Sequence, residues 1–543
     1  MRPDLVLDNA TVLTVDPDRP RAGSIAILDD RILAVGEAGE FAGLDVPTED
    51  LAGLTVVPGF NDAHNHMGAY GATLNEVALH PDRVRSVEEI VAAIADRAAA
   101  TPAGVWIIGT GYDDNKLAER RHPTRQELDR VSPDHPVLLN HNSGHFCVVN
   151  TAAMRLARIG EVEVPEGGVV AVGDDGQPNG LLEEQAQALA RSLLHPRAIA
   201  DMVENIGAAS DRYLSEGITS AQEAGVGGIL GISEPLEVAA YQQARRSGRL
   251  RVRVTMMPAV ETLHAVDHHV DDDEPFVLDL GLHSGFGDAW LKFGPVKIFA
   301  DGSLIGRTAA MFEDFEGEPG NNGYFQMPEA TLHSLILKAH RSGWQVATHA
   351  IGDRAVSSVI DAYAAALERH PRADARHRIE HCGMCRAVDV ERIAELGIVP
   401  VPQARFISEI GDGMARAVGS RRPDCYRQRS FLDAGVVLPG SSDRPVVNGA
   451  PMLGIHDLVN QRTADGEPFN PHEALTPDEA LHAYTWASAY ATFDERDRGS
   501  IAAGKLADLA VLDRDFTAVD AAEIAETQVV ATMVGGVFEH DLR

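Results

Sequence analysis

Short apolar runs alternate with longer amphipathic stretches through most of the chain, and each run ends in polar residues. This alternation is typical of βα units built around a parallel sheet. We therefore predict an α/β fold whose central part is a TIM-type (β/α)8 barrel. Its predicted strands are Val56–Val57 leading to His64, Gly217–Ser220, Val252–Thr255, Val296–Phe299, Gln345–Thr348, Ile379–Glu380, Ile398–Val401 and Val436–Leu438.

Helix-start signals accompany several of the amphipathic stretches. Ser86 and Glu89 have the S-x-x-E spacing of a capping box, and Thr476 with Glu479 repeats it. After Asp353, apolar residues recur at helical spacing. These stretches predict helices between the barrel strands.

Short β-branched runs separated by turn residues occupy residues 4–35 and return near the other end of the chain. We predict that both termini, residues 1–57 and 491–543, build one small β-sandwich beside a barrel domain at 58–490. Two further runs, Val105–Ile108 and Val137–Leu139, exceed the eight strands that a barrel needs. We assign about residues 68–185 to an insertion over the barrel mouth, where such folds elaborate their loops.

Composition narrows the classes of partner. The chain has 81 acidic against 47 basic residues and a formal net charge of −34, the wrong sign for binding nucleic acid or an anionic membrane. No run approaches the length of a membrane span, and Asp8 and Asn9 interrupt the first apolar stretch, so we expect no secretory signal. Four cysteines are too few for a disulfide framework, which predicts a cytoplasmic location. The oligomeric state stays open, with a homo-oligomer among the alternatives.

The strongest local motif is His64-Asn65-His66 at the end of the first predicted strand. Histidines at positions i and i+2 of a strand point to the same face, so the two imidazoles could share a metal ion. The motif alone fits ordinary polar histidines as well.

Lys297 lies inside the apolar run Val296–Phe299, where an uncompensated ammonium would be costly. One interpretation is an ion pair with a carboxylate such as Asp301, or a side chain that extends past the strand end to place its ammonium in water. The other is that burial lowers the pKa of the amine, which then reacts with carbon dioxide to form a carbamate, an anionic ligand for metal ions.

Three further polar residues end predicted strands: His349, His381 and Asp443. Each has an ordinary interpretation, since a histidine there can satisfy a hydrogen bond and an aspartate can cap a helix. Their order along the chain, after the H-x-H motif and Lys297, is the informative feature.

That order resembles the amidohydrolase superfamily, which presents H-x-H, Lys, His, His and Asp at the ends of barrel strands. The stretches 296–303, 348–353, 378–382 and 440–443 are similar to its amidohydrolase 3 subgroup, which includes YtcJ-like proteins and N-substituted formamide deformylases. The tail Arg498–Leu509 resembles the family's return into its β-sandwich.

The resemblance implies a centre that binds one or two metal ions. His64, His66 and Asp443 would hold one divalent ion, and His349 and His381 would hold a second. Zinc is the expected metal, because it favours ligands of this type. Carboxylated Lys297 would lie between them, and Asp443 would act as the catalytic proton carrier. The number of ions, one or two, is left open.

The implied reaction is hydrolysis of an amide-like carbon–nitrogen bond by a metal-activated hydroxide. N-acyl, N-formyl, carbamate and cyclic amide groups are the candidate substrates. A deaminase of the same superfamily is an alternative, against which Lys297 argues. A non-catalytic scaffold is another, but such proteins usually lose ligands.

Candidate substrate-binding residues are Tyr112 and His145 in the insertion and Arg307 after the Lys297 strand. Local packing or a surface ion pair explains Tyr112 and Arg307 equally well. For His145 the alternative is that it orders a loop, and substrate contact is the favoured interpretation. His141, near His145, could contact substrate or order a loop. The C-x-x-C motif at Cys382 and Cys385 has no second pair and is interpreted as a chance pairing. The run 268–274 is interpreted as an acidic, solvated loop.

Overall fold

The computed structural model describes residues 2–81, 83–141, 146–165, 168–173, 175–229, 232–267, 269–270, 272 and 274–543. The chain divides into two compact units. Unit 1 comprises residues 1–68, 209–230 and 237–543, and unit 2 comprises residues 69–208 and 231–236. None of the described helices combines the length and the apolarity needed to cross a membrane.

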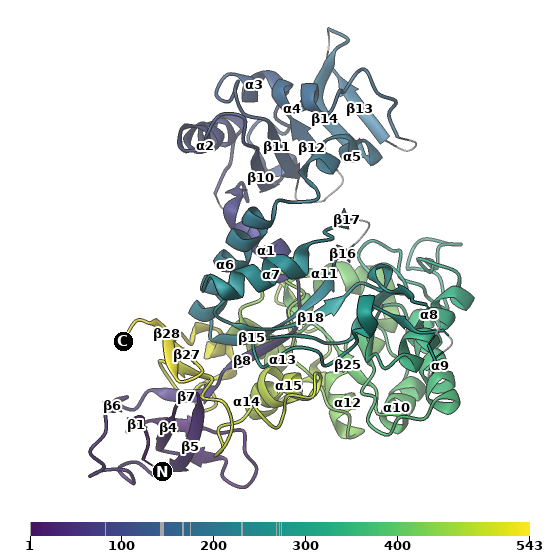
Figure 1. The fold of residues 1–543 in the computed structure, drawn as a ribbon. Helices are drawn as coiled ribbons and strands as arrows, with labels where there is room; N and C mark the ends of the chain where they lie inside the picture. Colours follow the sequence, from purple (N-terminus) through teal and green to yellow (C-terminus); the bar gives the residue numbers. More distant parts are fainter. Residues whose placement is uncertain are drawn as a thin grey trace. The chain divides into compact units, whose positions relative to one another are not determined.

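Unit 1 has a mixed α/β fold that contains two parallel four-stranded sheets (Figure 1). Most of their strands coincide with predicted ones, because apolar runs without interruption fill positions that are buried on both faces. The first sheet has the order β21 (Leu291–Phe293), β18 (Arg253–Pro258), β15 (Ile218–Val226), β8 (Phe60–Asn65). The second has the order β22 (Val296–Phe299), β23 (Val346–Ala350), β24 (Arg378–His381), β25 (Val399–Val401).

Two strand predictions were wrong in detail. Val56 and Val57 belong to β7 (Thr55–Pro58) of a different sheet, and the strand that carries His64 starts afresh at Phe60. Gly59 separates the two strands, and a Cβ there would lie 2.2 Å from the Thr219 side chain, so only glycine fits this close approach. Within the described residues 274–543, Val436–Leu438 form no strand.

Isolated contacts connect the edges of the two parallel sheets. Ala259, beyond β18, forms a parallel bridge with Lys297 of β22, and Gln403, beyond β25, forms one with Ser441. The Ala63 amide in β8 donates a hydrogen bond to the Gly440 carbonyl at 3.0 Å. The segment 440–443 therefore runs between β25 and β8, although it forms no continuous ladder.

Helices follow the strands of unit 1 in alternation, as the capping and periodicity signals predict. Buried apolar residues of α9, among them Val356, Val359 and Ile360, form its inner face. The helices are α1 (Met67–Asn75, of which only the first two residues belong to unit 1), α6 (Ile199–Ser215, continuing from unit 2), α7 (Glu237–Arg246), α8 (Glu329–Arg341), α9 (Asp353–Arg369), α10 (Ala387–Leu396), α11 (Arg405–Val418), α12 (Gln428–Asp433), α13 (Pro451–Asn460), α14 (Pro477–His482) and α15 (Ser488–Tyr490).

The two termini build two adjoining sheets in unit 1. One has the order β5 (Arg31–Gly36), β4 (Ser24–Leu28), β1 (Leu5–Asp8), β6 (Thr48–Asp50). The other has the order β28 (Val537–Asp541), β27 (Val529–Val534), β26 (Leu509–Leu512), β7, β2 (Thr11–Leu13), β3 (Arg21–Ala22). Leu7 and Ile25 of the first sheet share one hydrophobic core with Val56, Val511 and Met533 of the second.

Unit 2 contains a six-stranded mixed sheet, and residues 69–185 of the expected insertion lie in it. The sheet order is β13 (Gly168–Val172), β14 (Pro178–Glu184), β12 (Phe146–Val149), β11 (Val137–His141), β10 (Ile107–Tyr112), β9 (Val77–Ala78). Besides most of α1 and the first part of α6, the helices of this unit are α2 (Val87–Ala100), α3 (Arg125–Asp129), α4 (Thr151–Leu156) and α5 (Ala188–Arg191).

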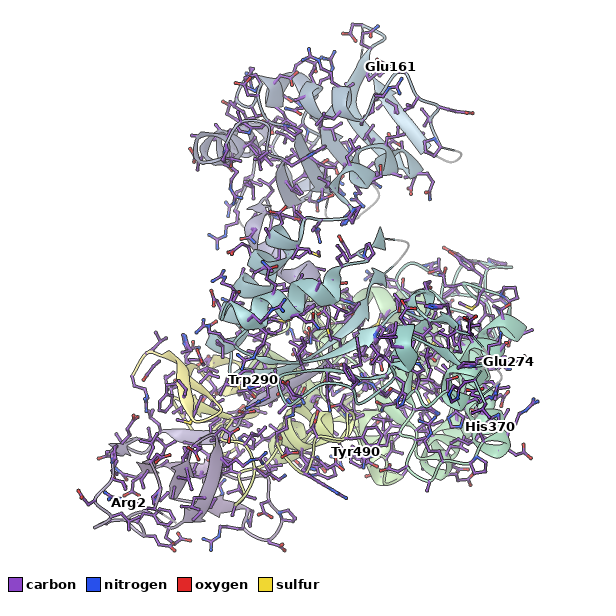
Figure 2. All side chains as sticks on the ribbon, viewed as in Figure 1. Arg2, Glu161, Glu274, Trp290, His370 and Tyr490 are labelled. Carbon is purple, nitrogen blue, oxygen red and sulfur yellow. The ribbon has the colours of Figure 1, made fainter. Side chains whose placement is uncertain are left out.

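Arginine guanidinium groups stack on aromatic rings between elements of unit 1, and Figure 2 labels two of these aromatic residues, Trp290 and Tyr490. The guanidinium groups of Arg245 in α7 and Arg253 in β18 lie 3.7 and 4.4 Å from the Trp290 ring centre. Arg376, just before β24, lies 3.7 Å from the ring centre of Tyr490 in α15. Such contacts stabilise the helix-to-strand packing by burying aromatic area beside a cation.

Candidate metal centre

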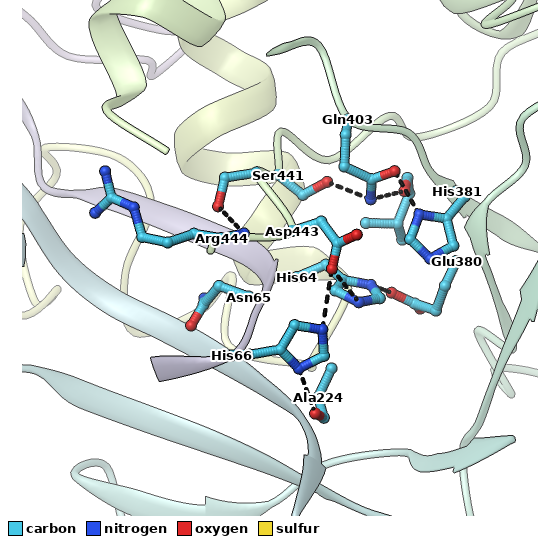
Figure 3. A network of polar contacts seen from close by, with 12 residues as sticks. His64, Asn65, His66, Ala224, Glu380, His381, Gln403, Ser441, Asp443 and Arg444 are labelled. Atoms are coloured by element: carbon cyan, nitrogen blue, oxygen red, sulfur yellow. Dashed lines mark hydrogen bonds and ion pairs between the residues drawn. The ribbon is translucent and has the colours of Figure 1, made fainter. Parts of the chain in front are cut away.

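The H-x-H motif lies at the carboxyl end of β8, a strand whose residues are all buried. His64 is the fifth residue of the strand, and His66 follows its last residue. Their Nε2 atoms both face the carboxylate of Asp443, whose Oδ1 lies 3.0 Å from that of His66 and 3.4 Å from that of His64 (Figure 3). Ligand atoms of these three residues all lie within 4.8 Å of one another. Residues almost 380 positions apart thus meet at one point.

Backbone contacts hold Asp443 at this position. Its amide donates a 2.7 Å hydrogen bond to the His64 carbonyl, and the His66 amide donates a 2.8 Å bond to the Arg444 carbonyl. The buried Asp62 carboxylate accepts hydrogen bonds from the amide and hydroxyl of Ser442, at 3.0 and 2.5 Å. Asp443 has φ of 60°, an unfavourable conformation for a residue with a Cβ. Such strain costs about 1–3 kcal/mol and is concentrated at functional sites.

Lys297, in β22, is 1% exposed, and its Nζ lies 3.4 Å from His64 Nε2. Burial lowers the pKa of its ammonium to about 8, although the nearby carboxylates of Glu380 and Asp443 partly oppose the shift. The fraction of this amine that is neutral near physiological pH is therefore larger than for an ordinary lysine, although the ammonium form still predominates. The alternative partner considered from the sequence, Asp301, instead accepts backbone hydrogen bonds from Ala310, Ile351 and Gly352.

His349 is the next-to-last residue of β23 and His381 is the last residue of β24, and both lie close to the first pair of histidines. The His381 ring centre is 5.0 Å from that of His64 and 4.4 Å from that of His349. Burial lowers the pKa of His349 to about 3 and that of His381 well below its usual value. Both imidazoles are therefore neutral at pH 7, the state in which histidine binds metals. His381, like Asp443, has positive φ, at 69°.

Each of the four imidazoles donates one ring N–H to a protein acceptor, which leaves the other nitrogen with a lone pair. The acceptors of His64, His66, His349 and His381 are, in that order, the Glu380 carboxylate, the Ala224 carbonyl, the Gly302 carbonyl and the Gln403 side-chain oxygen. For His64 and His66 the lone pair lies on Nε2, the atom that faces Asp443. A lone pair against a carboxylate is repulsive, and a cation between them relieves this repulsion. The donor set therefore fits a divalent ion of the zinc type.

Two buried residues that the sequence analysis missed position this centre. Glu380 is hydrogen-bonded to His64 Nδ1, and Arg378 binds both oxygens of Glu380, at 2.7 and 2.9 Å. Arg378 also donates to the Ala63 carbonyl at 2.7 Å. The sequence does contain a signal for this pair. Arg378 and Glu380 carry opposite charges and lie two positions apart in a short strand, so both side chains point to the face opposite to Ile379.

Gln403, beyond β25, was missed as well. Its side-chain nitrogen donates to the Val401 carbonyl and the Ser441 hydroxyl, at 2.9 and 3.1 Å, so its oxygen is left to accept from His381 at 2.6 Å. An isolated glutamine in a loop carries no sequence signal for this role.

The three predicted substrate-binding residues have different surroundings. Tyr112 lies in unit 2, fully buried, with its hydroxyl 3.0 Å from His122 Nδ1. Arg307 forms a 2.6 Å ion pair with Glu318 and has a positive φ of 52°. His145 lies outside the described residues. A role of these residues in substrate binding stays a prediction.

The C-x-x-C pair and the run 268–274 are the two remaining motifs from the sequence. Cys382 and Cys385 are buried free thiols, as are Cys147 and Cys425. Among the described residues, neither cysteine belongs to a group of potential metal ligands. In the run 268–274, His268, Asp271 and Asp273 lie outside the described residues.

Comparison with known proteins assigns the family. Residues 48–538 match the sequence model of the Amidohydrolase family. The chain is 32% identical to N-substituted formamide deformylase of Arthrobacter pascens, over 99% of this chain and 98% of that protein. It is 31% identical to the putative amidohydrolase YtcJ of Bacillus subtilis (strain 168), over 90% of each.

A solved structure gives the same result. The crystal structure of an uncharacterized metal-dependent hydrolase from Pyrococcus furiosus superposes with a TM-score of 0.76 at 29% identity, covering 94% of this chain and 99% of that one. The chain therefore belongs to the amidohydrolase family and is an enzyme of this class, the metal-dependent hydrolases of carbon–nitrogen bonds other than peptide bonds.

Proposed function

We propose that this enzyme hydrolyses an amide-like carbon–nitrogen bond of a small molecule, in an N-acyl, N-formyl, carbamate or cyclic amide group, with a water activated by bound metal. The observation that carries the proposal is the approach of Asp443 to the Nε2 atoms of both His64 and His66. The family relatives that hydrolyse such bonds, among them the formamide deformylase, support the type of bond.

Six side chains would form the metal centre. His64, His66 and Asp443 would hold one divalent ion, which we propose to be zinc, and His349 and His381 would hold a second where two are bound. A bound ion would supply Lewis acidity, lowering the pKa of the attacking water and polarising the scissile carbonyl. The lone-pair directions of the imidazoles support this assignment.

Asp443 would carry the proton. Its carboxylate takes a proton from the attacking water and returns it to the leaving nitrogen, which departs as a neutral amine. The backbone bond from the Asp443 amide to the His64 carbonyl keeps this carboxylate beside the ligands during both transfers.

Lys297 would act as an anionic ligand after carboxylation. Its neutral amine attacks carbon dioxide, forms a nitrogen–carbon bond and releases one proton, which leaves a carbamate. The buried position and the pKa of about 8 support this step, because both favour the neutral amine that reacts.

We also infer that the two parallel sheets of unit 1 belong to one closed (β/α)8 barrel and that the terminal sheets form a β-sandwich. The bridges Ala259–Lys297 and Gln403–Ser441 support closure, and the shared core of the terminal sheets supports the sandwich. We propose a cytoplasmic location from the four free cysteines.

A substrate panel tests the proposed function. Protein depleted of metal and then reloaded with zinc is assayed against N-formyl amines, N-acyl amino acids, carbamates and cyclic imides, with amine and carboxylate products quantified. We expect hydrolysis of at least one class that requires the reloaded metal. The assay also measures ammonia release from amino-substituted rings. Metal-dependent ammonia release with no hydrolysis of the panel would instead identify a deaminase.

A further inference from the structure

Unit 2 contains a second group of potential metal ligands, at one edge of its sheet. Strands β10 and β11 are parallel neighbours, with Tyr112 opposite His141 in the register. Asp113 and Asp114 follow β10 directly, and His141 is the last residue of β11. The carboxyl ends of adjacent parallel strands therefore bring these three side chains to the same edge, which is where α/β sheets commonly bind ligands.

The side chains converge on Asp114. Its Oδ1 lies 3.0 Å from His141 Nε2, and its Oδ2 lies 4.0 Å from Nε2 of His122. Ligand atoms of Asp113, Asp114 and His141 all lie within 4.8 Å of one another. Two carboxylates and one imidazole thus meet within a space the size of one metal coordination sphere, and the imidazole of His122 lies beside it, next to Asp114.

Aromatic residues orient the two imidazoles. The Tyr112 hydroxyl lies 3.0 Å from His122 Nδ1, and its ring packs edge-on against both His122 and His141, with centres 5.9 and 5.0 Å apart. The Phe146 ring packs against the same two imidazoles, at 5.2 and 5.5 Å. A hydrogen bond to the distal ring nitrogen and an apolar wall are the usual surroundings of a metal-binding histidine.

The backbone supports this arrangement. The register of β10 against β11 shifts between Thr110 and Tyr112, at Gly111, which has φ of 98°. A Cβ at Gly111 would lie 2.2 Å from the His80 ring, so the bulge depends on glycine. Bulges re-aim side chains, and this one precedes Tyr112, Asp113 and Asp114.

We propose that Asp113, Asp114, His122 and His141 bind one divalent ion of the zinc type, distinct from the ions held by the residues around Asp443. Four ligands from the protein characterise closed, structural sites. Such an ion would link the end of β10, through Asp113 and Asp114, to the end of β11, through His141. His122 would link it to the segment that precedes α3, so that the ion stabilises this edge of the unit 2 sheet.

Zinc counting on the full chain tests the proposal. Each purified protein is depleted of metal and equilibrated with a small excess of zinc, and its bound zinc is measured by mass spectrometry of the element. Asp114→Asn and His141→Gln are each expected to bind one zinc ion fewer than the wild type. Asp96→Asn, which removes one exposed carboxylate from α2 in the same unit, is the matched control and is expected to bind as many as the wild type.

A second comparison separates this site from the centre in unit 1. The His64→Asn/His66→Asn variant is expected to retain the zinc ion of unit 2, and adding Asp114→Asn to it is expected to remove that ion. Cobalt absorption spectra of the same proteins give an independent readout. If Asp114→Asn fails to fold, His122→Gln and His141→Gln carry the test. Zinc contents of Asp114→Asn, His122→Gln and His141→Gln that all equal that of Asp96→Asn would overturn the proposal.

Discussion

Glu380 accepts a hydrogen bond from Nδ1 of His64 while Arg378 binds both of its carboxylate oxygens. All three side chains are fully buried, so the network is shielded from water. Because the Nδ1 bond determines which His64 nitrogen carries the proton, Glu380 keeps the Nε2 lone pair facing Asp443. The carboxylate thus acts on the metal centre through the imidazole.

Glu380→Gln is therefore expected to weaken metal binding by about 10–100-fold, the usual effect of removing a carboxylate behind a histidine ligand. Zinc affinity measured by competition with a chelator checks this. The variant also leaves the buried Arg378 charge unpaired, which costs about 3–5 kcal/mol of stability.

The double variant Arg378→Gln/Glu380→Gln separates the two effects. It should recover much of the stability lost in Glu380→Gln and still bind zinc weakly. Glu395→Gln, on the exposed side of α10, is the matched control. Zinc affinity restored together with stability would show that Glu380 acts only through folding.

Much of unit 1 could be predicted from the sequence because its parallel strands are buried on both faces. Val296–Phe299 is a continuous apolar run around one lysine, and β22 has the predicted bounds. Polarity patterns failed where backbone geometry decided the outcome. Gly59 ends one strand and permits the next to begin against Thr219, a close approach that no hydrophobic pattern encodes.

The residues of the candidate metal centre also differ in how well the sequence reveals them. Residues that end strands, such as His64 and His349, are visible because a polar group there interrupts an apolar run. Glu380 and Gln403 act through contacts with residues distant in the chain or in loops, and their neighbours in sequence do not reveal those contacts. In the insertion, the sequence suggests only separate substrate contacts for Tyr112 and His141. That these two residues lie opposite each other follows from the pairing of β10 with β11, which the sequence does not reveal.

Asp443→Asn is expected to bind zinc with near-normal stoichiometry and to lose activity by about 10²–10⁴-fold, because an amide can ligate through its oxygen but cannot carry the proton. Steady-state kinetics with the substrate found in the panel and zinc content measured on the same sample check this. Asp433→Asn, on the surface near the end of α12, is the control for a lost carboxylate. Near-normal turnover in Asp443→Asn would disprove the proton-transfer role.

Carboxylation of Lys297 has a direct spectroscopic test. Wild-type protein equilibrated with carbon-13-labelled bicarbonate and zinc should give a carbamate resonance that is missing in Lys297→Gln. Lys292→Gln is the matched control, because Lys292 is also largely buried but its ammonium is hydrogen-bonded to Asp494 at 2.7 Å and to the Thr492 carbonyl. A carbamate resonance that disappears in Lys292→Gln and persists in Lys297→Gln would show that Lys292 is the carboxylated residue and would contradict the prediction.

The capping box of α14 predicts a pH-dependent contribution to stability. Glu479 accepts hydrogen bonds from the Thr476 amide and hydroxyl, at 2.7 and 2.8 Å, and its other oxygen accepts from Arg429 at 2.8 Å. The hydrogen bonds from Arg429, with those of Thr476, lower the pKa of Glu479 from 4.5 to about 2. The folded state therefore favours the ionised carboxylate more than the unfolded state does.

The sign follows from this depressed pKa. The stabilisation is fully present above pH 4.5, where the unfolded chain is also ionised, and it is lost as the pH falls towards 2. Because Glu479 is partly exposed, solvent screening reduces its contribution to about 1 kcal/mol. Glu479→Gln should lower the free energy of unfolding by this amount at pH 7, and its difference from the wild type should shrink between pH 4.5 and 3. Urea unfolding at several pH values measures this difference, with Asp478→Asn as the control for charge in the first helical turn. A difference that stays constant over that range would mean that the ionised carboxylate contributes nothing beyond its shape.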